Sequence, residues 1–232
     1  MARPVNMHNR QETAETIKRL AREQMRQQGT GGLSLRAIAR QMNMTAPAIY
    51  NYFASLDDLI TALIVDAFDG LAEATHQATA SEASYGVRIM AFMRAYRQWA
   101  LDDPTQFRLI YGTPIPNYQG PVAVIAPHAL KPFVPLMLLY AQAFQAGVLH
   151  PSAEYPVPSP SVAQFAQTWM QARHLDLPLS ILMPLMAGWT RLHGSVMLEL
   201  AGHIQPAVGD TTRYFEDDMR AYVLSLGLNP DG

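Results

Sequence analysis

The chain has 232 residues, enough for one large domain or for a small domain joined to a larger one, with a sizeable buried core. It contains no cysteine, which excludes disulfides and thiolate metal sites and is compatible with the reducing cytoplasm. The formal net charge of −2 argues by itself against a nucleic-acid partner, but it hides an uneven distribution.

Basic residues are concentrated at the N-terminal end of the chain. Residues 1–56 hold eight Lys or Arg against three acids, a sum of +5, and the remainder sums to −7. A basic head on an acidic body is typical of a polyanion-binding end, although a solvated helix face would look the same. The N-terminus has no apolar core, and no apolar run of about 18 residues lacks a charge or a breaker, so we expect neither a signal peptide nor a membrane span.

Four helices are predicted in the basic head and just beyond it. The first covers Arg10–Gln28 and ends at a cluster of glycines. Ser34 is predicted to cap the second helix and Thr45 the third, which carries Pro47 in its first turn, where a missing N–H does no harm. A long fourth helix starts at Ser55 and runs to about Ala80.

The rest of the chain is predicted to be helical, because its apolar residues recur at helical spacing and no segment alternates as a strand does. Proline-rich or polar breaks are expected at 113–120, 151–160 and 205–210. The predicted helices are Val87–Leu101, Pro104–Tyr111, Val122–Gly147, Ser161–His174, Leu179–Gly202 and Thr211–Leu226. The expected fold class is therefore all-α.

The segment Ser34–Phe53 has the pattern of a helix-turn-helix, in which two short helices form a wedge whose second helix can enter the major groove. The inside of the wedge would be formed by the apolar residues Ile38, Ala39, Met42, Met44, Ile49 and Phe53. The outside is left to Thr45, Ala46, Ala48, Asn51 and Tyr52. An ordinary helical hairpin in an all-α core would share this pattern.

DNA binding would give each outer residue a task. Arg36 can reach a guanine edge or a phosphate, and Thr45 and Tyr50 can donate to phosphates. The two alanines of the third helix are small enough to let the backbone approach DNA and touch thymine methyl groups. Asn51 can bind adenine or phosphate.

The run LSLRAIARQMNMTAPAIYNYFASLDDLITALI resembles the DNA-binding domain of the TetR family of bacterial repressors, and the resemblance covers about residues 10–64. In that family the equivalent of Thr45–Phe53 is the recognition helix, and the rest of the chain makes a ligand cavity and a dimer interface. The resemblance implies a DNA-binding surface made of Ser34, Arg36, Thr45, Ala46, Pro47, Ala48, Tyr50, Asn51 and Tyr52. The later segment WTRLHGSVMLELAGHI resembles a subgroup with a Trp…His-Gly signature.

Two positions depart from the family pattern. Many relatives have His where this chain has Tyr52 and Lys where it has Leu56, and both residues usually contact phosphate. Tyr52 keeps a hydrogen-bond donor, but Leu56 does not. We therefore expect fewer phosphate contacts and a shallower salt dependence of DNA binding, partly compensated by Arg10, Arg36 and Arg40.

Large, flexible or aromatic side chains are abundant in the middle helices, which suits an apolar ligand cavity, although for any single residue a packed helical core explains them better. Given the resemblance, the ligand-binding candidates are Met93, Tyr96, Trp99, Phe107, Tyr111, Met137, Phe165, Trp169, Trp189 and His193. No metal site is expected, because His193 and His203 are ten positions apart, His174 is distant and no thiolate is available. No cofactor or enzyme motif, such as a Gly-rich phosphate loop, occurs.

The sequence thus predicts a three-helix helix-turn-helix domain over 10–70 and a larger helical ligand-binding and dimerisation domain over 71–232. The last two long helices would pair across a two-fold axis, which matches two recognition helices in successive major grooves of palindromic double-stranded DNA. We expect a cytoplasmic homodimeric repressor, not an enzyme, that a small hydrophobic or aromatic ligand releases from its operator. The alternatives are a regulator without a small-molecule ligand and an all-helical enzyme.

Overall fold

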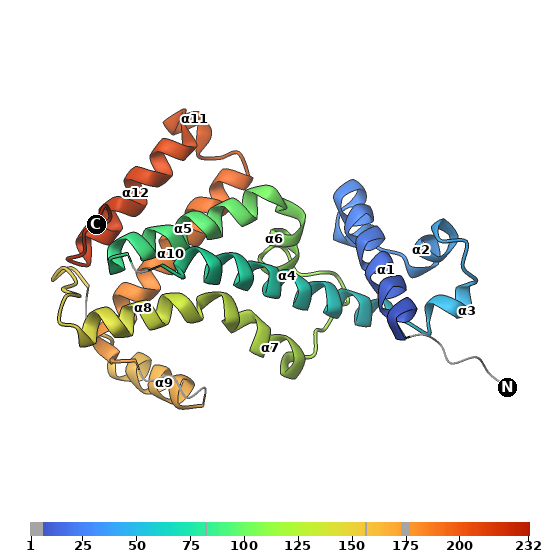
Figure 1. Cartoon of the computed structure of the whole chain (residues 1–232), viewed down its shortest axis with the longest axis horizontal. Helices are drawn as coiled ribbons and strands as arrows, with labels where there is room; N and C mark the ends of the chain where they lie inside the picture. The colour runs from blue at the N-terminus through green and yellow to red at the C-terminus, as the bar shows by residue number, and fades with distance from the viewer. Residues whose placement is uncertain (1–6, 82, 156, 173–176) are drawn as a thin grey trace. The chain divides into compact units, whose positions relative to one another are not determined.

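The computed structural model describes residues 7–81, 83–155, 157–172 and 177–232, and every regular element in those ranges is a helix (Figure 1). The predicted all-α fold is confirmed. The chain divides into two compact units. The first contains the described residues up to Gly70 together with Asp103–Lys131, and the second contains Leu71–Asp102 and Pro132–Gly232.

The first unit is built from five helices, a short 3-10 helix and half of a sixth helix. Its elements are α1 (Met7–Gln28), η1 (Thr30–Gly32), α2 (Leu35–Gln41), α3 (Ala46–Ile49), the first part of α4 (Leu56–Thr79), α6 (Pro104–Tyr111) and α7 (Val122–Leu130). Gly29 ends α1 with a φ of +73°, a conformation that residues with a side chain rarely adopt. The first and fourth predicted helices correspond to α1 and α4, which begin and end within three residues of the expected bounds.

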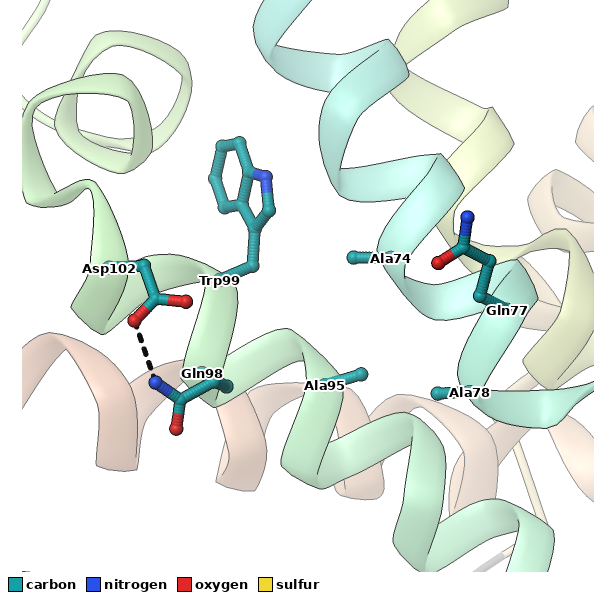
Figure 2. Close-up of a pocket in the computed structure, with 7 residues that line it drawn as sticks. All are labelled: Ala74, Gln77, Ala78, Ala95, Gln98, Trp99 and Asp102. Atoms are coloured by element: carbon teal, nitrogen blue, oxygen red, sulfur yellow. Dashed lines mark hydrogen bonds between the residues drawn. The ribbon is translucent and has the colours of Figure 1, made fainter.

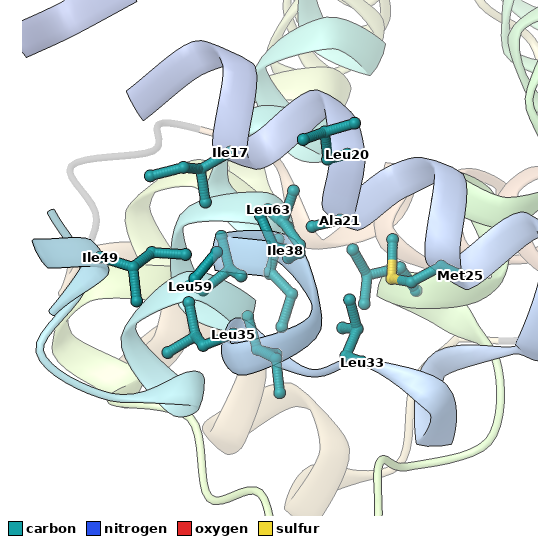
Figure 3. Close-up of a cluster of buried hydrophobic side chains, with 14 of the residues drawn as sticks. Ile17, Leu20, Ala21, Met25, Leu33, Leu35, Ile38, Ile49, Leu59 and Leu63 are labelled. Atoms are coloured by element: carbon teal, nitrogen blue, oxygen red, sulfur yellow. The ribbon is translucent and has the colours of Figure 1, made fainter. Parts of the chain in front are cut away.

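One apolar core joins α1, α2, α3 and α4 in this unit (Figure 3). Its labelled members are Ile17, Leu20, Ala21, Met25, Leu33, Leu35, Ile38, Ile49, Leu59 and Leu63. Burying one large aliphatic side chain stabilises a fold by about 1.5–3 kcal/mol relative to leaving it exposed. Because all four helices share these side chains, the core fixes the angle at which α3 leaves α2.

The segment Asp103–Lys131 packs on the same core. Leu109 of α6 is buried in it, and α6 contacts α1. The Thr61 and Tyr118 hydroxyls share a hydrogen bond of 2.9 Å, and Arg26 donates to the Asp103 carboxylate at 2.7 Å. Asp103–Lys131 was expected in the second domain, over 71–232, whereas its packing groups it with the first unit.

The second unit is arranged around α5. Its elements are the end of α4, α5 (Tyr85–Asp102), α8 (Val134–Gln145), α9 (Pro160–Gln171), η3 (Leu179–Ile181), α10 (Leu182–Leu200), α11 (Gln205–Val208) and α12 (Thr211–Ser225). α5 contacts α8, α10 and α12 (Figure 1). Between them, the buried Tyr222 hydroxyl bonds to the Tyr140 hydroxyl and donates to the Pro184 carbonyl at 2.6 Å. Gly188 leaves the space that the Tyr222 hydroxyl occupies.

A charged network ties three of these helices together. Arg97 of α5 donates two hydrogen bonds to Glu199 of α10, at 2.7 and 2.6 Å, and one to the Thr212 hydroxyl of α12 at 3.0 Å. Its guanidinium also lies 5.0 Å from the centre of the Phe215 ring. Burial opposes ionisation of Glu199, but the hydrogen bonds from Arg97 and its charge outweigh burial and lower the pKa of Glu199.

Three predicted helices differ from the observed ones. The single helix expected over Val122–Gly147 is divided into α7, η2 (Lys131–Phe133) and α8, because three prolines in this stretch lack the N–H that a continuous helix needs. Leu179–Gly202 begins as η3 before α10, and α11 lies within the expected break at 205–210. α9 is observed to Gln171, and the predicted helix end at His174 lies outside the described residues.

One described helical stretch, Val122–Gln145, is long and apolar enough to cross a membrane by length and composition alone. No membrane span was expected from the sequence, because every apolar run of about 18 residues contains a charge or a breaker, and this stretch contains Lys131 and three prolines. Core helices of soluble proteins satisfy the same two criteria, so this stretch is weak evidence for a membrane span.

Candidate nucleic-acid interface

The turn between α2 and α3 depends on Asn43. This residue has a φ of +53°, in the left-handed region that Asn tolerates better than most residues. Two hydrogen bonds close α2 there: the Asn43 N–H donates to the Arg40 carbonyl at 3.1 Å, and the Met44 N–H to the Ala39 carbonyl at 2.8 Å. The chain therefore turns sharply enough for α3 to cross α2, with which it is in contact.

The two predicted helix caps had different outcomes. The Ser34 hydroxyl accepts a hydrogen bond from the Ala37 N–H at 3.3 Å, so the predicted cap of α2 is confirmed. The Thr45 side chain makes no capping bond, so that prediction is wrong. Only the Thr45 carbonyl takes part, accepting from the Ala48 N–H at 3.0 Å. The Thr45 hydroxyl is consequently not engaged in capping α3.

The recognition helix is shorter than predicted. Regular α-helix covers only Ala46–Ile49, with Pro47 in the first turn as expected. The next residues continue as turns, in which the Tyr52 N–H donates to Ile49 at 3.0 Å and the Phe53 N–H donates to Ile49 at 3.2 Å. The expectation of a helix through Phe53 is therefore wrong in detail, although the chain keeps coiling over that distance.

Burial separates an inner from an outer face of this motif much as predicted. Ile38, Ala39 and Ile49 are buried, and Met42, Met44 and Phe53 pack against the core from its edge. Ala48 on the outside is half-buried. The other outer side chains are exposed: Arg36, Thr45, Ala46, Pro47, Tyr50 and Asn51. Tyr52 was expected outside but packs partly against the core, so less of its ring is presented to solvent.

Several basic residues of the head are already paired with acids. Lys18 and Arg22 both contact Asp66, at 2.8 and 2.5 Å, and Arg26 contacts Asp103. Burial disfavours the ionised form of Asp103, but hydrogen bonds from Arg26 and Gln106 outweigh it and lower the pKa of Asp103. These pairs hold the unit together and subtract from the charge available to a polyanion.

The exposed cations lie on α2 and at the start of α1. Arg36 and Arg40 are exposed, and neither has an acidic partner within the ranges that the structure describes. Arg10 donates from its guanidinium to the Asn51 carbonyl at 2.9 Å. This contact, which joins residues 41 positions apart and left no signal in the sequence, places a cation at the end of the recognition turn.

Only part of the predicted ligand set comes together. In the second unit the Tyr96 hydroxyl and His193 Nδ1 share a hydrogen bond of 2.9 Å, and the Trp189 ring centre is 5.6 Å from that of His193. Phe133, which the sequence analysis missed because it stands alone between prolines, adds a ring 5.9 Å from Trp189. With Phe92 beside Tyr96, these residues form an aromatic cluster, Phe92, Tyr96, Phe133, Trp189 and His193. Within it the buried Trp189 Nε1 has no hydrogen-bond partner among the described residues.

The other ligand candidates are scattered. Met93 and Met137 are core residues of the second unit, Trp169 is half-buried on α9, and Phe165 on the same helix is 73% exposed. Trp99 lines a groove of the second unit. Phe107 and Tyr111 lie in the first unit, where their rings are 5.2 Å apart and Tyr111 meets Phe68 edge-on.

A helical core that presents the short helix α3 at the surface beside basic side chains defines a helix-turn-helix DNA-binding regulator. The family model for bacterial regulatory proteins of the tetR family matches residues 17–63, and the model for the tetracyclin repressor-like C-terminal domain matches residues 89–222. The chain belongs to the TetR family of transcriptional regulators. That family and the curated relatives consist of regulators, not of enzymes.

Known relatives agree with this assignment. The chain is 40% identical over 114 residues to the HTH-type transcriptional regulator Rv1816 of Mycobacterium tuberculosis, a match that covers 48% of this chain and 49% of that protein. It therefore spans about half the length of the curated relatives it matches. The crystal structure of regulatory protein SCO4313 has a TM-score of 0.75 at 33% identity, covering 96% of this chain and 98% of that one. RolR in complex with resorcinol shares the fold alone, with a TM-score of 0.53 at 14% identity over 97% and 92% of the two chains.

Proposed function

We propose that this regulator is a homodimeric repressor that binds a palindromic operator through the outer face of α2 and α3. The observation that carries the proposal is the exposure of Thr45, Pro47, Tyr50 and Asn51 around a helix whose Ile49 is completely buried. A rigid helix with small and polar outer side chains fits the major groove, which is about 12 Å wide.

The side chains divide into base-reading and phosphate-binding groups. Ala46, Ala48 and Asn51 face the bases, where a methyl contact or an amide hydrogen bond discriminates between base pairs. Arg36 reaches a guanine or a phosphate. Contacts to the phosphate backbone of the DNA come from Thr45, Pro47, Tyr50 and Tyr52. Tyr52 contributes less to these contacts than the others, because its ring packs partly on the core. Ser34 acts by holding the first turn of α2 in place.

Dimerisation is assigned to α10 and α12. Both helices expose large apolar side chains, Met186 and Leu198 on α10 and Tyr214 and Leu224 on α12, each between 37% and 58% exposed. A second copy would bury these residues across a two-fold axis, and the same axis would relate two recognition helices to two half-sites of a palindrome. The protein would act in the cytoplasm, where its DNA is.

The ligand response is assigned to residues 71–232 and DNA recognition to residues 10–70. An aromatic ligand at the aromatic cluster would gain ring contacts and a hydrogen bond from the unpartnered Trp189 N–H. The fold of RolR holds resorcinol, a small aromatic ligand, in its complex. The segment Asp103–Lys131, packed on α1 and α4, would carry the change to the DNA-binding helices.

A second candidate is a TetR-type regulator without a small-molecule ligand. It is favoured by the dense packing of two ligand candidates, since Met93 and Tyr96 have no exposed surface. The two candidates differ in linkage: a ligand that weakens DNA binding must itself bind more weakly when the operator is present.

The proposal is tested by selecting bound fragments from genomic DNA and footprinting the best of them. We expect protection of a palindrome with half-site centres about 10 base pairs apart or a multiple of that spacing. A metabolite screen on this complex then identifies the releasing ligand. Protection without two-fold symmetry would contradict the homodimer, and a ligand whose affinity is unchanged by saturating operator would contradict ligand release.

A further inference from the structure

An open groove lies between the end of α4 and the second half of α5 (Figure 2). Its volume is about 460 Å³, within the range of small-molecule sites. The floor consists of Ala74 and Ala78 from α4 and Ala95 from α5, and Ala78 and Ala95 point toward each other. Small side chains on both helices leave the space, and none of these residues belongs to the aromatic cluster.

The polar rim of the groove consists mainly of hydrogen-bond acceptors. Gln98 donates its amide N–H to the Asp102 carboxylate at 2.7 Å, and Gln77 donates its amide N–H to Glu73. Each glutamine thus has its nitrogen turned to an acid and keeps its amide oxygen for another partner. A ligand that enters the groove meets two amide oxygens and one carboxylate.

The charge of the rim is negative. Among the residues that the structure describes, no Lys, Arg or His lines the groove. Asp102 is exposed and forms no ion pair with any residue in the described ranges. The adjacent Glu73 is also exposed. An anion would be repelled at this rim, whereas a cation with N–H donors would satisfy its acceptors.

The remaining wall is aromatic. Trp99, one turn before Asp102 on α5, extends its indole along the groove beside Ala74 (Figure 2). Among side chains, an indole gives the strongest attraction to a cation and also packs well against a flat ring. We propose that this groove is a binding site for a small planar organic cation, whose ring lies on Trp99 and the alanines and whose ammonium group binds Asp102.

The site has a consequence for DNA binding that rests on the proposed function. Ala74 and Ala78 belong to α4, and the same continuous helix carries Leu59 and Leu63 into the core of the helix-turn-helix unit. A ring bound between α4 and α5 contacts α4 directly, and α4 is the helix that α2 and α3 pack against. The cation would then change operator affinity without entering the aromatic cluster.

The test uses three probes of the same shape and different charge: 1-naphthylmethylammonium, the neutral 1-naphthalenemethanol and the anion 1-naphthoate. Isothermal titration of the full-length protein should show the cation binding with a Kd below about 1 mM and at least about tenfold more tightly than either isostere. In ¹H–¹⁵N spectra the cation should shift the Trp99 indole signal, assigned with Trp99→Phe, and leave that of Trp169 in place.

Two substitutions locate the site. Asp102→Asn removes the charge and Ala78→Leu fills the groove, and each should weaken cation binding at least about tenfold while the variants melt within a few degrees of the wild type. Asp217→Asn, which removes another exposed acid, from α12, should leave cation binding unchanged.

Equal binding of the three probes, no binding of the cation, or unchanged binding by Asp102→Asn would overturn the groove site. Operator affinity is measured separately with and without the cation. A cation that binds in the groove but leaves operator affinity unchanged contradicts the coupling through α4, whereas the failure of the protein to bind any operator contradicts the proposed function and not the groove.

Discussion

Asn43 is the residue on which the geometry of the helix-turn-helix depends most. A side chain without a polar group in the left-handed region costs roughly 1–2 kcal/mol, whereas glycine has no such penalty. We predict that Asn43→Ala lowers the free energy of unfolding by about 1 kcal/mol and weakens operator binding, and that Asn43→Gly is close to wild type in both. Urea denaturation and fluorescence anisotropy measure the two effects. If Ala and Gly behave alike at this position, its backbone conformation is not what sets the turn.

His193 makes the stability of the second unit dependent on pH. Burial lowers the pKa of His193 below its ordinary value of 6.5. The unfolded chain therefore takes up the proton first as the pH falls, so this contribution to stability is complete above 6.5 and is lost progressively below it. The melting temperature should fall as the pH drops below about 6.5, and the fall should be smaller in His193→Asn. An equal fall in both proteins would assign the effect to other groups.

At the site, the capping and burial that depend on neighbours in the sequence were predictable, and those that depend on distant partners were not. The Ser34 cap and the burial of Ile38 and Ile49 follow from local spacing and hold in the structure. Thr45 looks like an equally good cap, but its backbone bond to Ala48 does not involve the hydroxyl. Tyr52 looks polar and exposed, yet it packs against a core that α1 and α4 complete.

Two ion pairs formed by arginines of α5 differ mainly in burial, and they should therefore differ in their contribution to the free energy of unfolding. In the Arg97–Glu199 pair both side chains are about 10% exposed, whereas Arg94 and Glu216 are 47% and 31% exposed. A buried cation left without its partner is costly, while an exposed pair contributes at most about 1 kcal/mol. We predict that Glu199→Gln lowers the free energy of unfolding by about 2–4 kcal/mol and that Glu216→Gln lowers it by less than about 1 kcal/mol.

Chemical denaturation at neutral pH compares the two variants, and Glu216→Gln is the matched control because both acids accept two hydrogen bonds from an arginine of α5. Equal losses would mean that burial does not decide the strength of these pairs. If the free energy of unfolding of Glu199→Gln also depends less steeply on denaturant concentration than that of the wild type, α10 and α12 no longer unfold together with α5.

Helix positions were largely predictable from periodicity, but the grouping of the helices was not. Pro104–Tyr111 has the expected bounds, because Asp103 caps it and Pro104 fits its first turn. Its assignment to the first unit depends on Leu109, which enters a core formed some 40 to 90 residues earlier in the chain. Amphipathic spacing shows that a helix has an apolar face, but it does not show which core receives that face.

The charge of the whole molecule limits how strongly it can hold DNA. Of the described basic residues in the head, Lys18, Arg22 and Arg26 are paired with acids, which leaves Arg10, Arg19, Arg36 and Arg40 at the surface. If three of these four contact phosphates in each subunit, the proposed dimer neutralises about six phosphates.

The slope of log affinity against log salt concentration should then be about −5 for the dimer on its operator. Arg36→Gln and Arg40→Gln should each make the slope shallower by about 2, since every substitution is present twice. A slope of −8 or steeper would show that other cations, such as those paired with Asp66, move onto the DNA.

The most direct test of the central claim, that the face around α3 binds DNA, is the operator affinity of a matched pair of charge variants. Ala48→Asp places a negative charge on that face, and Ala207→Asp places the same charge on α11 in the second unit. Fluorescence anisotropy with a labelled operator duplex should show no specific binding by Ala48→Asp and wild-type affinity for Ala207→Asp, while both elute as wild-type dimers. Retention of operator binding by Ala48→Asp would contradict the account.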